Sequence, residues 1–408
     1  MATRFAGPVL ILLLAGILSG QETLSQLEAR AAALKARGDA AGALAAWEKA
    51  AEIAPRSARV QDEIGFLLAV LNRRQEAVSH FEQALKFDSR FAAAHYHLGV
   101  ALWIDDQREK AVPELETAVS IEPAAFDHRY FLGQALNATS QFARALKELE
   151  AAVKLNPKMS EAWNQLGLAR QRTGATDAAI EAYRRAVALA PENYDARNNL
   201  GFVLVNSGKS EEGLAQFHKI LEAEPGNNMA RVNAGFAYLQ KADLDQAEVQ
   251  FREVLRRDPD SAIAHYDLGI ALKQKDNLEG AKQEIARALA LDPSLAEGHY
   301  TLGIIHWQSG EFDGAATEFR LALDLNPQYG EAWFMLGTAL KQKGDLEAAE
   351  TALRAAIRFD PSNPGPYNTL GQLLRQKGDT EGSRRLFEQG ANAKAKKEAD
   401  LGKMLQKK

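Results

Sequence analysis

The sequence contains no cysteine among its 408 residues. This absence excludes disulfide bonds, thiolate metal sites, cysteine catalysis and a lipid-modified N-terminal cysteine. Neither sign of charge dominates, because 49 lysines and arginines face 54 acidic residues and leave a net charge of −5. Nothing in that balance attracts nucleic acid. Aromatic residues are few, at 8%, but hydrophobic residues make up 46%, which is typical of a folded globular chain rather than a disordered or fibrous one.

Long hydrophobic runs are also absent, apart from one short run near the N-terminus. Arg4 precedes the apolar residues 9–18, and the small residues Ser19 and Gly20 follow them. A basic start, a short apolar run and a small-residue exit are typical of a secretory signal peptide, here spanning residues 1–20 with cleavage after Gly20. The run is shorter than the roughly 20 residues that cross a bilayer. We therefore expect an exported protein, periplasmic or extracellular. An uncleaved N-terminal helix that anchors the protein to a membrane remains the alternative.

Glycine positions define a strict internal repeat. Ten glycines recur at intervals of 34 residues from Gly65 to Gly371, and one further step back reaches the small residue Ala31. Because such a period indicates stacked structural units, we divide residues 24–397 into eleven repeats. Residues 398–408 then form a basic C-terminal tail that completes a capping helix. The repeats begin at residues 24, 58, 92, 126, 160, 194, 228, 262, 296, 330 and 364.

Four positions of the repeat, numbered 1 to 34, predict a helix–turn–helix unit. Position 8 is small, which suits a close crossing of two helices, and position 24 is always large and apolar. Position 15 is glycine in six repeats and asparagine or aspartate in three, as a left-handed helix end requires. Position 32 is proline in nine repeats and ends the second helix. Pro113 lies inside the second helix of the third repeat, where we expect it to kink that helix or delay its start.

With this pattern the chain resembles the tetratricopeptide repeat family over nearly its whole length. The resemblance implies an all-α, right-handed superhelical solenoid whose concave groove binds peptides or proteins. The clearest repeat spans residues 160–193, and the residues that match the family pattern are Trp163, Leu166, Gly167, Ala179, Tyr183, Ala186 and Pro191.

A helical projection of the first helix of each repeat identifies the face that would line this groove. Positions 4, 7, 8 and 11 form the core stripe and positions 3 and 10 an alanine row, which leaves positions 2, 5, 6, 9, 12 and 13. On that face position 9 is mostly apolar, position 12 holds two tryptophans and later three cations, and position 6 holds two asparagines. The candidate partner-binding residues are Phe66, Val100, Trp103, Leu168, Asn199, Phe202, Asn233, Phe236, Ile270, Lys273, Ile304, Trp307, Lys341 and Arg375.

Two interpretations of this face stay open. The apolar stripe at position 9 either completes the packing between neighbouring helices or receives partner side chains. Position 13 is apolar in the first four repeats and an amide from the sixth repeat onward. In one interpretation, the N-terminal groove binds apolar side chains of a partner and the C-terminal groove binds polar or acidic groups. In the other, the change is random sequence variation on a solvated face.

We find no pattern that indicates catalysis or metal binding. His95 and His97 point to different faces of a helix, and His299 and His306 lie two turns apart, about 10.5 Å along the axis. His95, His265 and His299 share position 4, where a structural role is expected. No phosphate loop, nucleophile elbow or zinc-protease motif is present. We therefore expect no enzyme activity, no cofactor and no small-molecule substrate, with an enzyme accessory subunit as a remote alternative.

The lysine-rich C-terminal tail, residues 391–408, is expected to cap the last repeat. Its alternative role is contact with anionic lipid or an acidic partner. The sequence thus predicts a scaffold that binds an unidentified protein or peptide, with no nucleic-acid partner, in cell-envelope or secretory assembly.

Overall fold

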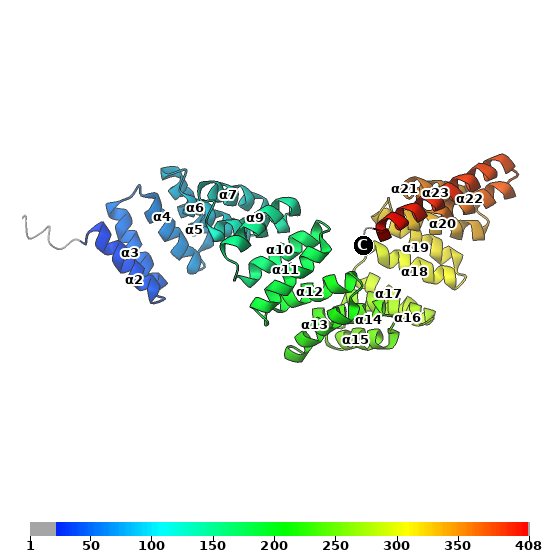
Figure 1. Cartoon of the computed structure of the whole chain (residues 1–408), viewed down its shortest axis with the longest axis horizontal. Helices are drawn as coiled ribbons and strands as arrows, with labels where there is room; N and C mark the ends of the chain where they lie inside the picture. Colours follow the sequence, from blue (N-terminus) through cyan, green and yellow to red (C-terminus); the bar gives the residue numbers. More distant parts are fainter. Residues whose placement is uncertain (1–21, 407–408) are drawn as a thin grey trace, which may run out of the picture. The chain divides into compact units, whose positions relative to one another are not determined.

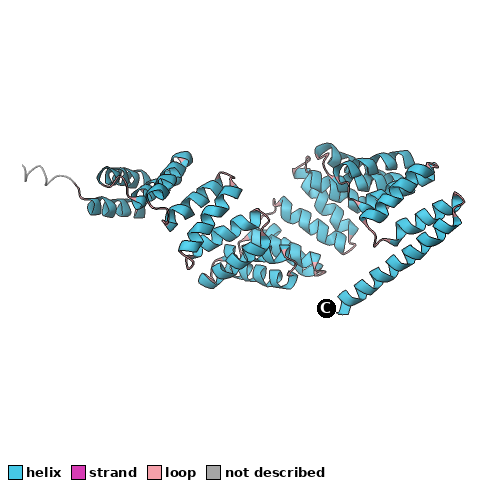
Figure 2. Ribbon diagram, turned by 90° about the horizontal axis from the view of Figure 1, so that it is seen from above, coloured by secondary structure: helices cyan, strands magenta, loops and turns pink. Residues whose placement is uncertain are grey.

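A computed structural model describes residues 22–406 as 22 helices, with no strand in that range (Figures 1 and 2). The predicted signal peptide, residues 1–20, lies outside the described residues. The helices form tandem pairs, with one pair in each 34-residue repeat. The all-α solenoid expected from the sequence is therefore confirmed.

The chain divides into two compact units, residues 1–203 and 204–408, and the division falls within α12 (Tyr194–Asn206). Each unit is described by itself. Before α12 the helices are α2 (Leu24–Ala36), α3 (Ala40–Ile53), α4 (Ala58–Val70), α5 (Arg74–Phe87), α6 (Ala92–Ile104), α7 (Arg108–Ile121), α8 (Phe126–Ala138), α9 (Phe142–Leu155), α10 (Ser160–Arg172) and α11 (Thr176–Leu189).

The second unit continues the same alternation of first and second helices. Its last helix is the longest at 27 residues, so the basic tail continues the second helix of the last repeat through residue 406. After α12 the helices are α13 (Ser210–Ala223), α14 (Asn228–Gln240), α15 (Leu244–Arg257), α16 (Ala262–Gln274), α17 (Leu278–Leu291), α18 (Ala296–Gln308), α19 (Phe312–Leu325), α20 (Gly330–Lys343), α21 (Leu346–Phe359), α22 (Pro364–Gln376) and α23 (Thr380–Gln406).

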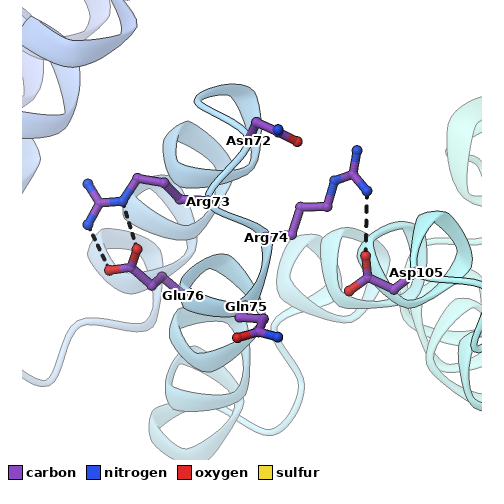
Figure 3. Close-up of a pocket in the computed structure, with 6 residues that line it drawn as sticks. All are labelled: Asn72, Arg73, Arg74, Gln75, Glu76 and Asp105. Carbon is purple, nitrogen blue, oxygen red and sulfur yellow. Dashed lines mark hydrogen bonds and ion pairs between the residues drawn. The ribbon is translucent and has the colours of Figure 1, made fainter.

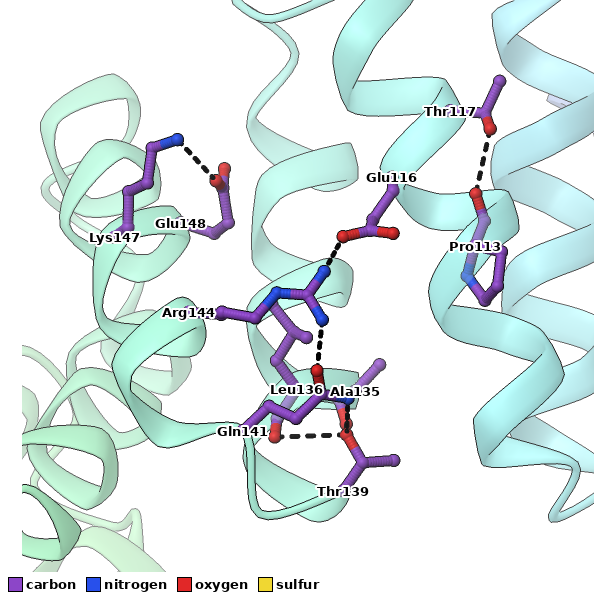
Figure 4. Close-up of polar contacts among 10 residues, drawn as sticks. All are labelled: Pro113, Glu116, Thr117, Ala135, Leu136, Thr139, Gln141, Arg144, Lys147 and Glu148. Atoms are coloured by element: carbon purple, nitrogen blue, oxygen red, sulfur yellow. Dashed lines mark hydrogen bonds and ion pairs between the residues drawn. The ribbon is translucent and has the colours of Figure 1, made fainter.

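Pro113 does not delay the start of its helix, which corrects that part of the expectation. Helix α7 begins at Arg108, the same repeat position at which α5 and α9 begin. The first four N–H groups of any helix lack an intrahelical acceptor, so a proline at the sixth residue removes only one later backbone hydrogen bond. The carbonyl of Pro113 is used nonetheless, since it accepts a hydrogen bond from Thr117 Oγ1 at 2.9 Å (Figure 4).

The turn inside every repeat contains a left-handed residue at position 15. Six are glycines, as predicted, and Asn72, Asp106 and Asp276 adopt the same conformation with φ of 62°, 59° and 61°. Ser140 and Ala242 also adopt it, at 59° and 58°, although neither residue type favours it. The geometry of the turn is therefore imposed by the repeat even where the local residue opposes it.

Position 8 is small because it lies against the large side chain at position 24 of the same repeat. A Cβ built on Gly167 would stand 2.5 Å from Tyr183 Cε1, and one on Gly235 would stand 2.5 Å from Phe251 Cε1. Those aromatic side chains are fully buried. The close crossing predicted for position 8 is confirmed, and its partner is the position 24 side chain.

The first helices form an inner layer within each unit. Consecutive first helices contact one another directly, as α4 contacts α6 and α18 contacts α20. The second helices from α3 to α9 and from α13 to α21 pack against the first helix of the next repeat. Side chains still link some second helices across the outer layer, because Arg144 of α9 pairs with Glu116 of α7 (Figure 4). Within the described residues, no helix is both long enough and apolar enough to cross a membrane.

Candidate partner-binding groove

The predicted groove residues all belong to the inner layer of first helices, and most are half-buried. Only Phe202 and Arg375 among them are exposed. Phe66, Val100 and Ile304 pack against the hydrophobic cores of their units. Position 9 therefore contributes to packing, and it also keeps part of its surface accessible.

The first unit exposes an apolar edge next to this row. Val70 and Ile104, at position 13 of consecutive repeats, have 57% and 55% of their surfaces exposed. Trp103 is half-buried against the core, and the Arg108 guanidinium carbon lies 5.4 Å from the centre of its ring. These side chains form an accessible hydrophobic strip on α4 and α6.

The corresponding edge of the second unit is polar. Lys341 donates to Gln372 Oε1 at 3.1 Å, and burial lowers the pKa of Lys273. Trp307 is half-buried, and its Nε1 has no hydrogen-bond partner in the described structure. The glutamines at position 13 of this unit are exposed: Gln240, Gln274, Gln308, Gln342 and Gln376.

The predicted asparagine contacts are already used within the protein. Asn199 Nδ2 donates to Asn164 Oδ1 at 3.0 Å, and Asn233 is also engaged. The Asn164–Asn199 bond joins position 5 of one repeat to position 6 of the next. The same two positions are joined by the His97–Asp62 pair at 2.8 Å.

The helical projection places position 5 on the groove face, but no residue at this position is among the candidates. Position 5 lies beside position 2 of the next repeat, since Glu28 pairs with Arg59 at 3.8 Å and a Cβ on Gly365 would stand 3.0 Å from the Phe334 ring. Four tyrosines occupy position 5, and each is followed 31 residues later by a carboxylate. The pairs are Tyr96 with Asp127, Tyr130 with Glu161, Tyr266 with Glu297, and Tyr300 with Glu331.

Burial and charge act on these tyrosines together. Burial raises the pKa of the Tyr96 and Tyr130 hydroxyls above the ordinary value, and the negative charge of Asp127 or Glu161 adds to the rise. Tyr300 shows the same two causes, with Glu331 as the charge. All four carboxylates are exposed, and none has an ion pair in the part of the chain that the structure describes.

One groove carboxyl, Asp267, keeps its proton to a much higher pH than an ordinary aspartate does. It occupies position 6 of α16 without a hydrogen-bond or ion-pair partner among the described residues. Burial raises its pKa to about 7.

The histidines at position 4 have a structural role, as expected, and the structure shows its form. His95 Nδ1 lies 2.6 Å from Glu114 Oε2, and its Nε2 lies 3.1 Å from the carbonyl oxygen of Ser89 in the preceding turn. His265 makes the same two contacts with Glu284 and Pro259. Other residues at position 4 donate to the same turn carbonyl, at 3.0 Å for Trp163 and 2.9 Å for Trp333.

A surface hollow lies outside the groove, at the edge where repeats two and three meet. It encloses about 620 Å³ and is lined by Asn72, Arg73, Arg74, Gln75, Glu76 and Asp105 (Figure 3). Its charged side chains pair with one another: Arg73 with Glu76 at 2.7 Å and Arg74 with Asp105 at 3.8 Å. Similar hollows recur beside residues 106–110 and 310–314, so they follow from the stacking of repeats.

Within residues 22–406, no group of three or more metal-ligating side chains is placed to hold a metal ion. The inner layer presents apolar strips, amides, tyrosine hydroxyls and carboxylates without ion pairs among the described residues.

Models of the tetratricopeptide repeat match residues 92–124, 122–238, 232–296 and 300–364, which together span more than half of the chain. No curated protein matches the sequence significantly. Among solved structures, yeast Tom70 is 15% identical with a TM-score of 0.50, and the match covers 94% of this chain and 96% of Tom70. This likeness concerns the fold alone.

Two further matches are shorter. YrrB, described as a TPR protein with an unusual peptide-binding site, is 27% identical over 45% of this chain and 95% of its own, with a TM-score of 0.42. MamA of Desulfovibrio magneticus RS-1 is 26% identical over 42% of this chain and 96% of its own, with a TM-score of 0.40.

Proposed function

Because the chain belongs to the tetratricopeptide repeat family, we propose that it is a non-catalytic scaffold that binds a protein or peptide segment along its first helices. The observation that carries the proposal is the apolar strip of the first unit. Val70 and Ile104 are more than half exposed beside the half-buried Trp103. Contiguous exposed apolar surface at neighbouring helices is a feature of interaction sites.

The energetics favour a partner that covers this strip. Burial of apolar surface contributes about 25 cal/mol per Å², so covering two branched side chains and the accessible part of an indole stabilises a complex measurably. Tryptophan is also among the residues that most often dominate binding energy at interfaces. A repeat array adds many such contacts on one continuous surface.

We place this scaffold in cell-envelope or secretory assembly, outside the cytoplasm. The support is the sequence of residues 1–20, with Arg4, a short apolar run and the small residues Ser19 and Gly20. N-terminal sequencing of the protein isolated from its native cells tests the compartment. A mature chain that starts near Gln21 supports export with cleavage, whereas an intact Met1 in the membrane fraction supports the tethered alternative.

Peptide-array binding with a matched pair of variants tests the groove. Ile104→Asp places a charge on the apolar strip, and Gln83→Asp places one at an exposed position on the second helix α5. We expect Ile104→Asp to lower the affinity for the bound peptides at least tenfold and Gln83→Asp to change that affinity less than twofold. Both variants should have the helicity of the parent protein by circular dichroism. Equal binding by both variants and the parent protein contradicts the proposal.

A further inference from the structure

The four tyrosine–carboxylate pairs of the inner layer have unbalanced charge. Asp127 and Glu161 in the first unit, like Glu297 and Glu331 in the second, are exposed and have no cation near enough to pair with them in the described structure. Elsewhere in the protein many carboxylates form ion pairs. For example, Lys275 Nζ lies 2.7 Å from Asp245 Oδ1 and 2.8 Å from Glu248 Oε2. Exposed carboxylates without an ion pair in the described structure also occur on second helices, as Glu82 of α5 and Asp324 of α19 show, so the tyrosine beside each groove carboxylate is what distinguishes these four.

The position of a carboxylate in the first turn of a helix has an ordinary explanation, because it stabilises the positive end of the helix dipole. That explanation does not account for the tyrosine beside it. Asp195 provides the contrast, since it is an exposed carboxylate at the same position whose neighbour at position 5 is Asn164. The pairing with tyrosine is therefore separable from the helix-end effect.

The first repeat shows what occupies such a site when a cation is available. There Glu28 stands at position 5, and the guanidinium of Arg59 from the next repeat lies 3.8 Å from its carboxylate. Positions 5 and 2 thus bring a guanidinium and a carboxylate together on the inner layer. In the tyrosine-bearing repeats the carboxylate is present at position 2 and the cation is absent from the described structure.

The same groove also holds an acceptor that lacks a donor. Asn137, on the same helix as Asp127, has 5% of its surface exposed, and its Nδ2 donates to the Gln165 carbonyl and side chain at 3.0 Å. Its Oδ1 has no hydrogen-bond donor in the described structure. This buried acceptor is a local cost to the fold, and it lies ten residues after Asp127, about 15 Å along the helix axis, so it is not part of the Tyr96–Asp127 site.

We propose that the Tyr96–Asp127 and Tyr130–Glu161 pairs of the first unit receive two arginine or lysine side chains of an extended partner segment. This inference rests on the proposed groove function and names the chemistry of its partner. A guanidinium interacts with both members of the pair, since its N–H groups donate hydrogen bonds to the carboxylate and its plane stacks on the tyrosine ring. Packed helices lie about 8–10 Å apart, and an extended chain rises about 3.3 Å per residue. The two cations are therefore three residues apart.

The first unit suits such a segment better than the second. At position 12 of repeats three and four it carries Trp103 and Asn137, which are uncharged. The second unit carries Lys273 and Lys341 at that position, and these repel a cationic partner. The apolar strip of Val70 and Ile104 then contacts the uncharged residues of the same segment.

The test measures fluorescence anisotropy of labelled nonapeptides with the full-length protein. The probe contains alanine, valine and threonine with two arginines three residues apart. One comparison peptide has adjacent arginines, and another has glutamates in place of the arginines. The protein variants are Asp127→Asn with Glu161→Gln, and Asp195→Asn as the matched control at a helix end without a tyrosine.

We expect the probe to bind at least tenfold more tightly than either comparison peptide. Its affinity should fall as the salt concentration rises. We expect the double variant to lose at least tenfold in affinity and Asp195→Asn less than twofold. Equal binding of arginine and glutamate peptides, or equal binding by the double variant and the parent, overturns the proposal. Binding of neutral apolar peptides that is weakened only by Ile104→Asp also overturns it, while the groove function stands. If no peptide of any class binds, both proposals fail.

Discussion

At the scale of single residues, the repeat imposes conformations that individual side chains do not favour. All eleven residues at position 15 are left-handed, including Ser140 and Ala242. That conformation costs a residue with a Cβ about 1–2 kcal/mol in steric strain. Glycine has no such strain, although it loses more conformational entropy on folding than other residues do. The stacking of the repeats therefore outweighs a local cost at two of the turns.

Ala242→Gly is expected to stabilise the protein by about 0.5–1 kcal/mol, because it removes this strain. The reverse change, Gly174→Ala, is expected to cost about 1 kcal/mol through strain alone, since a Cβ there would meet no atom within 4 Å. Urea denaturation of both variants measures the two effects. If the two substitutions shift the unfolding midpoint in the same direction, strain at position 15 does not determine the change in stability.

The pKa of Asp267 makes stability depend on pH. Burial raises this pKa to about 7, so the folded state holds a proton that the unfolded state releases above about pH 4. The contribution of Asp267 to the free energy of unfolding therefore falls as pH rises from about 4 to about 7, and is constant above that.

Asp267→Asn removes this dependence. The variant is expected to be about 4 kcal/mol more stable than the parent at pH 8 and nearly equal at pH 4. Thermal unfolding at several pH values measures the difference. Asp195→Asn, which removes an exposed carboxylate, serves as the control, and a pH-independent difference for Asp267→Asn contradicts the assignment.

At the scale of the helix pair, stability depends on how closely position 8 approaches position 24. A Cβ on Gly167 would stand 2.5 Å from Tyr183, whereas one on Gly371 would stand 3.1 Å from Phe387. Alanine also gains about 1 kcal/mol over glycine inside a helix. The two effects oppose each other, and the distance decides which one prevails.

Gly167→Ala is therefore expected to destabilise the protein by about 1–2 kcal/mol, because overpacking costs more than the gain in helix propensity. Gly371→Ala is expected to be neutral or slightly stabilising. Thermal unfolding followed by circular dichroism compares the two variants. A larger loss for Gly371→Ala than for Gly167→Ala would show that the crossing distance does not set the cost.

Repeat periodicity predicts most of the helix pair and little of its polar contacts. Positions 8, 15, 24 and 32 each have one physical task, so their residue types alone place the helices and the turns. Position 4 holds histidine, arginine, tryptophan or tyrosine in different repeats, and only the structure shows that these side chains reach the same turn carbonyl, as Trp163 and His265 do.

The groove was predicted in outline for a similar reason. A helical projection of one repeat identifies the face, but position 5 and position 2 of the next repeat are 31 residues apart, so their contact depends on stacking. The position of Asn199 shows the same limit. Its amide was a candidate for partner binding, and the structure shows it bonded to Asn164 in the preceding repeat.

At the scale of the whole molecule, the array contains two kinds of inner surface. Exposed carboxylates without an ion pair in the described structure occur on both, and in the first unit they accompany the exposed side chains of Val70 and Ile104. The second unit combines amides with Lys273 and Lys341. The same fold thus presents different chemistry along its length.

Site-specific photocrosslinking in the native host tests the central claim, that the inner layer of first helices holds a protein partner. The crosslinking residue replaces Ile104 on that layer in one strain and Gln83, an exposed residue of the second helix α5, in another. We predict that a discrete crosslinked protein forms from position 104 and not from position 83. Crosslinks from position 83 alone, or equal crosslinks from both positions, would contradict the claim.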